Sequence, residues 1–358
     1  MRSLFGAKSI TRIEQMNNKL EHRQSKEFWF TAPNQVEVRN TELRKPGPTE
    51  VVVSVLYSAI SAGSELLLYR GEMPSDMPLD SSIDSLKTDV GYPKKYGYAC
   101  VGTIIEVGAK VETSWLGREV FCFHPHASHV IASIEELIAI PEGIAMKDAV
   151  FLPNMETAVN LAQDGKPLVG ERVVILGQGI VGLLLADLLS QYPLTSLTSF
   201  DKDEDRREWS KQAGVSRVFA PAKLTPDELS TVSDTDLIYE VSGQPEAVNL
   251  AIELAGFSSR IVLGSWYGTK SAKVELGGVA HRNRLQFITS QVSTIGPDLT
   301  GRWDKTRRIS LVWELLKKVR PSKFISHSVD IQDAPEFYKR INDGEKGILQ
   351  VIFKYEDG

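Results

Sequence analysis

Residues 173–182, VVILGQGIVG, form the stretch that decides the fold of this chain. The four apolar residues at 173–176 predict a buried strand, and apolar positions 181, 184, 185, 188 and 189 predict a following helix. Between them lies a G-x-G-x-x-G turn, in which each glycine has a separate task. Gly177 permits the tight turn, Gly179 lets a pyrophosphate approach the backbone, and Gly182 lets helix and strand pack closely.

The surroundings of this turn predict a dinucleotide site. The helix that starts there offers free N–H groups and a positive dipole end to a phosphate. A second predicted strand, 196–200, ends in Asp201, and an acid about 20 residues after the turn is placed to bind the ribose 2′-hydroxyl. The alternative is a glycine-rich turn without a ligand. Strand, helix and acid together favour the dinucleotide.

The composition is that of an ordinary globular protein. The chain has 358 residues and a net charge of −5, so it has room for two domains and lacks the basic surface that nucleic acid or an anionic membrane requires. No apolar run is long enough to cross a bilayer. Cys100 and Cys122 cannot build a disulfide framework. We therefore expect a cytoplasmic protein with reduced thiols that binds neither nucleic acid nor a membrane.

The pattern along the chain predicts an α/β protein with several segments. Residues 1–26 are polar and charged and predict an extension rather than a secretory signal. Residues 27–155 contain short alternating strands, whereas 156–294 alternate strands with helices, which predicts a doubly wound parallel sheet. Residues 295–358 are expected to return to the first domain. Residues 71–95 form a long loop that we expect to cover the substrate.

Ligands of such a sheet bind beyond the carboxyl ends of its strands. Asp201 favours NAD over NADP because its carboxylate repels a 2′-phosphate, although Lys202 and Arg206 leave NADP possible. The alternative is that these two cations belong to a solvated helix face. The predicted cofactor-binding residues are Gly177, Gln178, Gly179, Ile180, Val181, Gly182, Asp201, Lys202, Arg206, Val241, Ser242, Gly264, Ser290, Gln291 and Val292.

Three landmarks give the chain a family resemblance. They are SAISAGSE at 58–65, GYACVG at 97–102 followed by IIEVG, and the VVILGQGIVG turn. From about residue 27 onward the sequence resembles the medium-chain dehydrogenase/reductase superfamily. HRNR at 281–284 and SQVS at 290–293 look like the threonine-dehydrogenase-related branch, which includes bacteriochlorophyllide hydroxyethyl dehydrogenase-like proteins. The resemblance implies a Rossmann domain inserted into a GroES-like β-rich catalytic domain.

The sequence departs from the zinc-dependent members at their metal ligands. Those members have a catalytic cysteine where this chain has Ala62, and a histidine and glutamate where it has Tyr98 and Ala99. The third ligand region falls near Pro153 and Asn154. Zinc prefers Cys, His or carboxylate ligands in a tetrahedral array, so we predict no catalytic zinc and no other metal site.

A second possibility for a metal is an unfamiliar site in the histidine-rich segment HPHASH, 124–129. Its three histidines and Glu65 supply suitable ligand types. Ligand type without geometry is a weak indication of a site. The alternative is that these histidines line the cleft, cap a turn or lie on a strand face.

Without zinc, a side chain must meet the negative charge that hydride transfer leaves on the substrate oxygen. Tyr98, at the position of a ligand histidine, is the predicted donor. By resemblance Ser64 begins the proton relay, Glu65 tunes it and His126 passes the proton onward. The alternatives are that Tyr98 only fills the vacated space, that Glu65 pairs with an arginine, and that His126 has no catalytic role.

The predicted function is a zinc-independent NAD(P)-dependent oxidoreductase that moves a hydride between nicotinamide and a secondary alcohol or ketone. One alternative is a reductase of activated C=C bonds, such as those of enones or quinones. Another is a dinucleotide-binding protein without turnover. Besides a small-molecule substrate, the expected partner is a second copy of the chain, because the apolar edge strand at 285–290 is suited to pairing in a homodimer.

Overall fold

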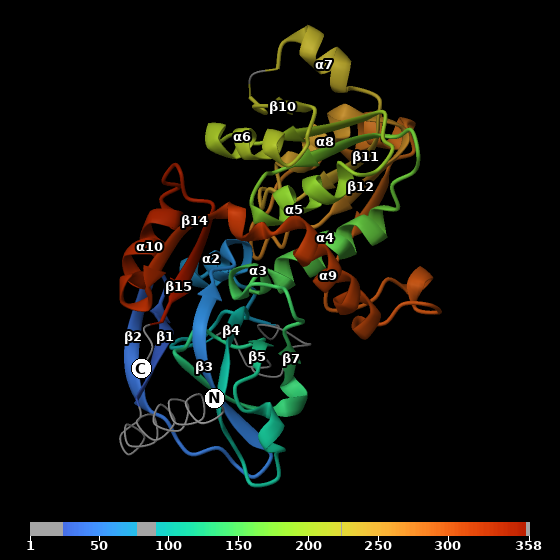
Figure 1. The fold of residues 1–358 in the computed structure, drawn as a ribbon. Helices are drawn as coiled ribbons and strands as arrows, with labels where there is room; N and C mark the ends of the chain where they lie inside the picture. The colour runs from blue at the N-terminus through green and yellow to red at the C-terminus, as the bar shows by residue number, and fades with distance from the viewer. Residues whose placement is uncertain (1–23, 77–90, 223, 356–358) are drawn as a thin grey trace.

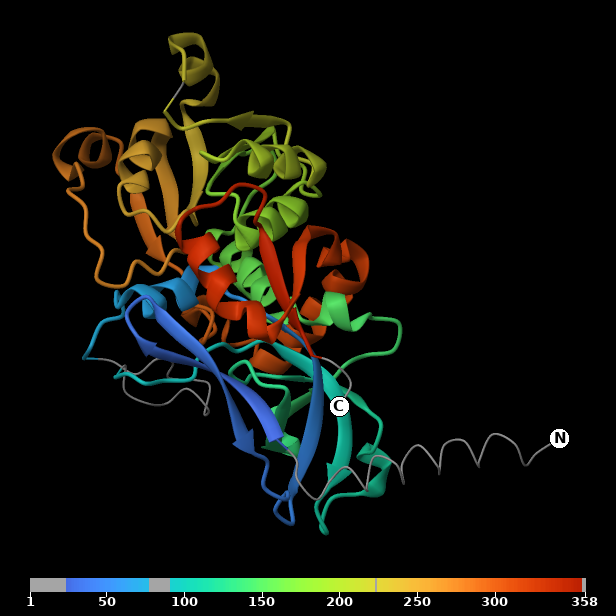
Figure 2. The ribbon, with the colours of Figure 1, turned by 90° about the vertical axis from the view of Figure 1, so that its left-hand side faces the viewer.

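The structure, a computed structural model, describes residues 24–76, 91–222 and 224–355. In this part of the chain two β-sheets form the centres of two domains. Figures 1 and 2 show them as an upper lobe in green, yellow and orange and a lower lobe in blue and cyan, with the red C-terminal segment against the lower one. None of the described helices is both long and apolar enough to span a membrane.

The upper sheet is the doubly wound parallel sheet that the sequence predicts. Its strands follow the order β10-β9-β8-β11-β12-β13, and every neighbouring pair is parallel. The VVIL run is buried at its centre in β8 because helices cover both faces. The strands are β8 (Arg172–Leu176), β9 (Ser196–Phe200), β10 (Arg217–Phe219), β11 (Thr235–Glu240), β12 (Ala255–Leu263) and β13 (Gln286–Thr289).

The helices of this domain connect successive strands. α4 begins at Leu152, and Pro153 lies in its first turn, where a missing N–H leaves no bond unmade. α7 was not predicted, since its seven residues, PDELSTV, are too few and too polar to show an apolar helical period. The helices are α4 (Leu152–Gly165), α5 (Ile180–Leu189), α6 (Glu204–Gln212), α7 (Pro226–Val232) and α8 (Ala247–Leu254).

The lower sheet joins the two ends of the described chain. Its order is β14-β15-β3-β4-β5-β7, with β6 also paired to β3, and β1 and β2 form a separate antiparallel hairpin. The strands are β1 (Gln24–Ala32), β2 (Gln35–Glu42), β3 (Glu50–Ala59), β4 (Cys100–Val107), β5 (Glu119–Cys122), β6 (His129–Ser133), β7 (Leu137–Ala139), β14 (Ile325–Asp330) and β15 (Gln350–Lys354).

Four further helices surround this sheet and the junction of the domains. They are α2 (Ala62–Arg70), α3 (Met146–Ala149), α9 (Lys305–Val319) and α10 (Ala334–Asn342). α2 contains the SAGSE landmark and ends at Gly71, which adopts a left-handed φ of 73°. The long loop predicted to cover the substrate starts at this residue. Residues 77–90 of that loop, and most of the predicted extension at 1–26, lie outside the described residues.

One hydrophobic core runs through both domains. It contains Ala59 and Phe121 from the lower sheet, Val173 from the upper sheet, and the buried faces of α4, α5 and α9. α4 therefore packs against the upper sheet and against α9 at once, as Figure 1 shows. Because burial stabilises the chain in proportion to apolar area, this shared core fixes the edge of the Rossmann sheet relative to the β-rich domain.

Candidate active site

The glycine turn between β8 and α5 has the geometry of a phosphate cradle. Gly177 has a φ of +101°, and a Cβ there would lie 2.5 Å from Cα of Ser242. A Cβ on Gly182 would lie 2.1 Å from the carbonyl oxygen of Gly177. By contrast, nothing lies within 4 Å of a Cβ built on Gly179, the N-cap of α5. The turn is thus closed on its protein side and open at the helix N-terminus, where a phosphate would bind.

Asp201 lies at the end of β9 beside this turn. It is 8 % exposed, and its Oδ2 accepts a 2.7 Å hydrogen bond from the N–H of Gln178. Its Oδ1 accepts from the N–H of Asp203 at 2.8 Å. Since each carboxylate oxygen accepts more than one hydrogen bond, both retain capacity for ribose hydroxyls. The backbone therefore holds the Asp201 carboxylate in place next to the phosphate cradle.

The cations near Asp201 are mostly engaged elsewhere. Arg207 donates to the carbonyl oxygens of Asp201 and Lys202 at 2.9 and 3.0 Å. Arg206 reaches the carbonyl oxygen of Ile348 at 3.5 Å, in the segment between α10 and β15. Lys202 is exposed. Of these three cations, Lys202 alone has a side chain that makes no hydrogen bond to another described residue.

The other predicted cofactor residues gather at the same edge because the strands are parallel. Val241 and Ser242 follow β11, Gly264 follows β12, and the 290–292 segment follows β13. Ile180 and Val181 form the first turn of α5.

Sequence analysis missed Glu240, a fully buried carboxylate at the end of β11. It accepts from the N–H of Ser242 at 2.8 Å and from the hydroxyl of Tyr267 at 2.5 Å. Burial and the nearby carboxylate raise the pKa of Tyr267, which keeps this phenol protonated as a donor. An acid directly after an apolar strand was the available signal. The pair holds the loop after β12 over the cofactor edge.

Ser64 and Tyr98 meet in the β-rich domain. Their hydroxyl oxygens are 2.8 Å apart although the residues are 34 positions apart, and both side chains are partly exposed. Ser64 stands on α2, whose end contacts the loop after β12, because the N–H of Thr269 donates to the carbonyl oxygen of Glu72 at 2.9 Å. This contact brings α2 to the side of the Rossmann sheet where its strands end.

Glu65 and His126 lie behind this pair, and both are fully buried. Oε1 of Glu65 accepts from the N–H of Ser61 at 2.6 Å, which satisfies the start of α2. Oε2 lies 3.0 Å from Nε2 of His126 and also accepts from the hydroxyl of Tyr338. Nδ1 of His126 is 2.7 Å from the Ser58 hydroxyl, so both ring nitrogens have partners inside the domain. Glu65 is paired with a histidine and a tyrosine, not with an arginine.

The residues present at the predicted ligand positions do not fit a catalytic zinc. Ala62, Ala99 and Pro153 have no ligand atom in their side chains, and zinc needs Cys, His or carboxylate groups. Within the described ranges there is no group of three His, Cys, Asp or Glu residues that could hold a metal ion.

The alternative histidine site is not assembled either. Nδ1 of His124 lies 2.8 Å from the carbonyl oxygen of Pro125, and Nδ1 of His129 lies 3.1 Å from the Ser128 hydroxyl. Each ring is thus turned to its own neighbour, while His126 pairs with Glu65.

Known proteins share this architecture. A solved structure of an alcohol dehydrogenase (RspB) of Escherichia coli CFT073, complexed with NADH, superposes with a TM-score of 0.74 at 21% identity, covering 93% of this chain and 99% of that one. The chain shares the fold of this dehydrogenase. This confirms the predicted Rossmann sheet inserted in a β-rich domain. No protein-family model matches the sequence.

Curated relatives of this fold are also dehydrogenases. D-guloside 3-dehydrogenase of Escherichia coli K12 is 24% identical over 89% of this chain and 96% of its own length. A zinc-type alcohol dehydrogenase-like protein of Haemophilus influenzae is 20% identical over 89% of this chain and 95% of its own length. The predicted dehydrogenase class is confirmed at this level. The predicted absence of zinc is not confirmed, because one relative is described as zinc-type.

Proposed function

We propose that this chain is an NAD(P)-dependent oxidoreductase of secondary alcohols and ketones that uses the Tyr98–Ser64 hydroxyl pair in place of zinc. The observation that carries the proposal is the 2.8 Å contact between these hydroxyls, at a position where zinc-dependent members hold a ligand histidine. D-guloside 3-dehydrogenase, a relative, is named for oxidation at position 3 of a sugar derivative, which supports a secondary alcohol as the substrate group.

When bound, the nicotinamide supplies or accepts the hydride, and the remaining chemistry falls to side chains of this protein. In the reducing direction the phenol of Tyr98 donates a hydrogen bond, and then its proton, to the substrate oxygen as negative charge develops there. The hydroxyl of Ser64 turns to donate to the phenolic oxygen and stabilises the charge left on it. In the oxidising direction the same proton returns to Tyr98.

We assign Glu65 and His126 to positioning rather than to the relay. Both are fully buried, and their hydrogen bonds join them to each other and to Ser61, Tyr338 and Ser58, not to Tyr98. The carboxylate holds the first turn of α2, on which Ser64 stands. A fixed donor geometry is what electrostatic stabilisation of a transition state requires.

We propose NAD rather than NADP as the cofactor. The Asp201 carboxylate occupies the ribose end of the site, where it accepts hydroxyl donors and repels a phosphate. Arg206 and Arg207 donate to backbone carbonyl oxygens and leave Lys202 as the remaining nearby cation of the three.

We also propose a homodimer through the edge of the Rossmann sheet. β13 ends the order of the described strands, and Phe287 on it is 39 % exposed. Phe257 and Leu276 nearby in the same domain are 71 % and 55 % exposed. Pairing of two β13 strands would cover an open edge and apolar surface. Analytical ultracentrifugation is expected to give twice the monomer mass for the wild type and a shift towards monomer for Phe287→Asp.

The proposal is tested by metal analysis and cofactor turnover on the same purified protein. We expect less than about one zinc per ten chains and NADH oxidation with a ketone that survives treatment with a chelator, since no metal-bound water or carbonyl is involved. Stoichiometric zinc whose removal abolishes turnover would refute the proposed chemistry. Turnover confined to enones or quinones would favour the C=C reductase, and NADH binding without hydride exchange would favour a non-catalytic role.

A further inference from the structure

A polar network holds the segment that follows β13, and the side chains of α4 and α9 that form it have no role in the site described above. Glu156, Asn160 and Asp164 are four residues apart on α4 and therefore share one helix face. Asp164 accepts from the hydroxyl of Ser290 at 2.7 Å, and the amide nitrogen of Asn160 donates to both Asp164 and Ser290 at 2.9 Å. The polar side chains of α4 thus hold Ser290, the first residue after β13.

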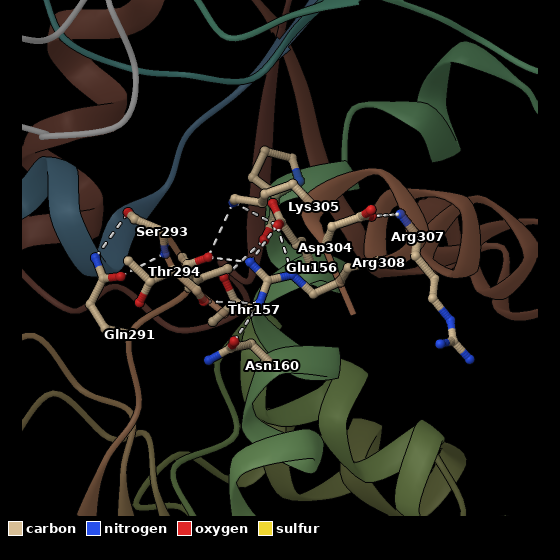
Figure 3. A network of polar contacts seen from close by, with 12 residues as sticks. Glu156, Thr157, Asn160, Gln291, Ser293, Thr294, Asp304, Lys305, Arg307 and Arg308 are labelled. Atoms are coloured by element: carbon tan, nitrogen blue, oxygen red, sulfur yellow. Dashed lines mark hydrogen bonds and ion pairs between the residues drawn. The ribbon is translucent and has the colours of Figure 1, made fainter. Parts of the chain in front are cut away.

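Arg308 of α9 also belongs to this network, and Figure 3 shows its guanidinium reaching Glu156, Asn160 and Thr294. Its guanidinium is fully buried and pairs with Glu156 at 2.9 Å. It also donates to Oδ1 of Asn160 at 2.5 Å, to the carbonyl oxygen of Thr294 at 3.3 Å and to that of Val292. A planar guanidinium with donors in a fixed fork holds several acceptors in one geometry, which an ammonium does not.

The position of this network relates it to one half of the cofactor site. The glycine turn after β8 and Asp201 after β9 define the pyrophosphate and the adenosine ribose. In the strand order β10-β9-β8-β11-β12-β13, the nicotinamide half must then extend over β11 to β13, on the other side of β8. Val292 directly follows β13 on that side. The network therefore fixes backbone beside the reacting half and does not touch the adenosine half.

We propose that Arg308, with the polar face of α4, is a positioning residue for the nicotinamide half of the dinucleotide. The inference rests on the proposed dinucleotide function. It assigns to a buried ion pair a task beyond stability, because the same guanidinium that neutralises Glu156 also sets the carbonyl oxygens of Val292 and Thr294. A lysine at position 308 keeps the charge but lacks the fork, so the carbonyl oxygen of Thr294 loses its Arg308 donor and that of Val292 keeps only Lys305, at 3.1 Å.

The test compares NADH with ADP-ribose, which lacks the nicotinamide, by isothermal titration on the full chain. For Arg308→Lys we expect the Kd of NADH to rise about tenfold and that of ADP-ribose to stay within about twofold, because only the nicotinamide half loses its support. The matched control is Arg260→Lys. Arg260 pairs with Glu171 at the amino end of the same sheet, so both affinities should stay within about twofold of the wild type.

A second variant keeps the proposal open to refutation if Arg308→Lys does not fold. Asp164 is only partly buried, and Asp164→Ala removes the acceptor for Ser290 without leaving a charge unpaired at the core. We expect the same selective loss of NADH binding. A variant that weakens both ligands equally, or neither, overturns the inference while the dinucleotide function stands. A wild type that binds neither ligand overturns both.

Discussion

Replacing Tyr98 by phenylalanine separates the proposed chemistry from a space-filling role. The substitution removes one hydroxyl, and with it the 2.8 Å contact to Ser64, and keeps the ring that packs edge-on against Tyr96. A partly exposed neutral hydrogen bond contributes about 1 kcal/mol to folding. Loss of a donor at the developing charge raises the barrier by about 3 to 4 kcal/mol, or roughly 10²- to 10³-fold in kcat.

The two magnitudes make the prediction testable. For Tyr98→Phe, the free energy of unfolding measured in urea is expected to fall by about 1 kcal/mol and NADH binding to stay normal. Its kcat should fall by roughly 10²-fold or more. The control is Tyr92→Phe, which removes a phenol hydroxyl bonded to the carbonyl oxygen of Leu68 on the same helix, α2. The control should keep kcat within about twofold, since its hydroxyl is bonded to a backbone carbonyl oxygen of α2 and not to Ser64. Equal kcat in Tyr98→Phe and wild type would refute the donor role.

Three further outcomes follow from the structure. Asp201→Ala should weaken NADH binding by about tenfold or more and reduce the preference for NADH over NADPH, as measured by cofactor fluorescence; an unchanged preference contradicts the assignment. Burial lowers the pKa of His124 to about 4. The folded state therefore loses up to about 3 kcal/mol of stability from this group as pH falls from the unfolded pKa of about 6.5 towards 4. Urea unfolding at pH 5 and pH 7 should show a smaller pH dependence for His124→Asn than for the wild type. Glu65→Gln should lower the free energy of unfolding by about 2 kcal/mol or more, because a buried acceptor of several donors is lost. An unchanged melting temperature, followed by circular dichroism, would contradict this expectation.

Much of the fold could be predicted because its signals are local. The β8–turn–α5 unit shows its strand, its glycines and its helix within residues 172–189, and Ser196–Phe200 was predicted with the bounds that the structure has. α2 was missed for a physical reason. Its sequence AGSELLLYR has no amphipathic period, and the side chain of its N-cap, Ser61, makes no capping hydrogen bond. Instead, Glu65 inside the helix accepts from the N–H of Ser61. Tertiary burial of its leucines decides the conformation there.

The site was predictable only as far as spacing determines it. The resemblance places Ser64 and Tyr98 in one predicted site, but the hydrogen bond between their hydroxyls was not predicted. Which partners surround Glu65 did not, because Tyr338 is 273 residues away and its hydroxyl reaches Glu65 only when α10 packs on the β-rich domain. The Glu156–Arg308 pair has the same character, with 152 residues between its members. Long-range polar pairs leave no periodic trace in one sequence.

The proposed use of hydroxyls in place of a metal changes what the scaffold must supply. A zinc ion is held by ligands from several elements, and this coordination itself fixes the electrophile. A phenol on a rotatable side chain has no such constraint, so its geometry must come from packing and from hydrogen bonds behind it. In this chain Ser64 bonds the phenol, Glu65 fixes the helix that carries Ser64, and Tyr338 and His126 fix Glu65. In the proposed mechanism, this buried network therefore supplies the fixed geometry that metal ligation provides in zinc-dependent enzymes.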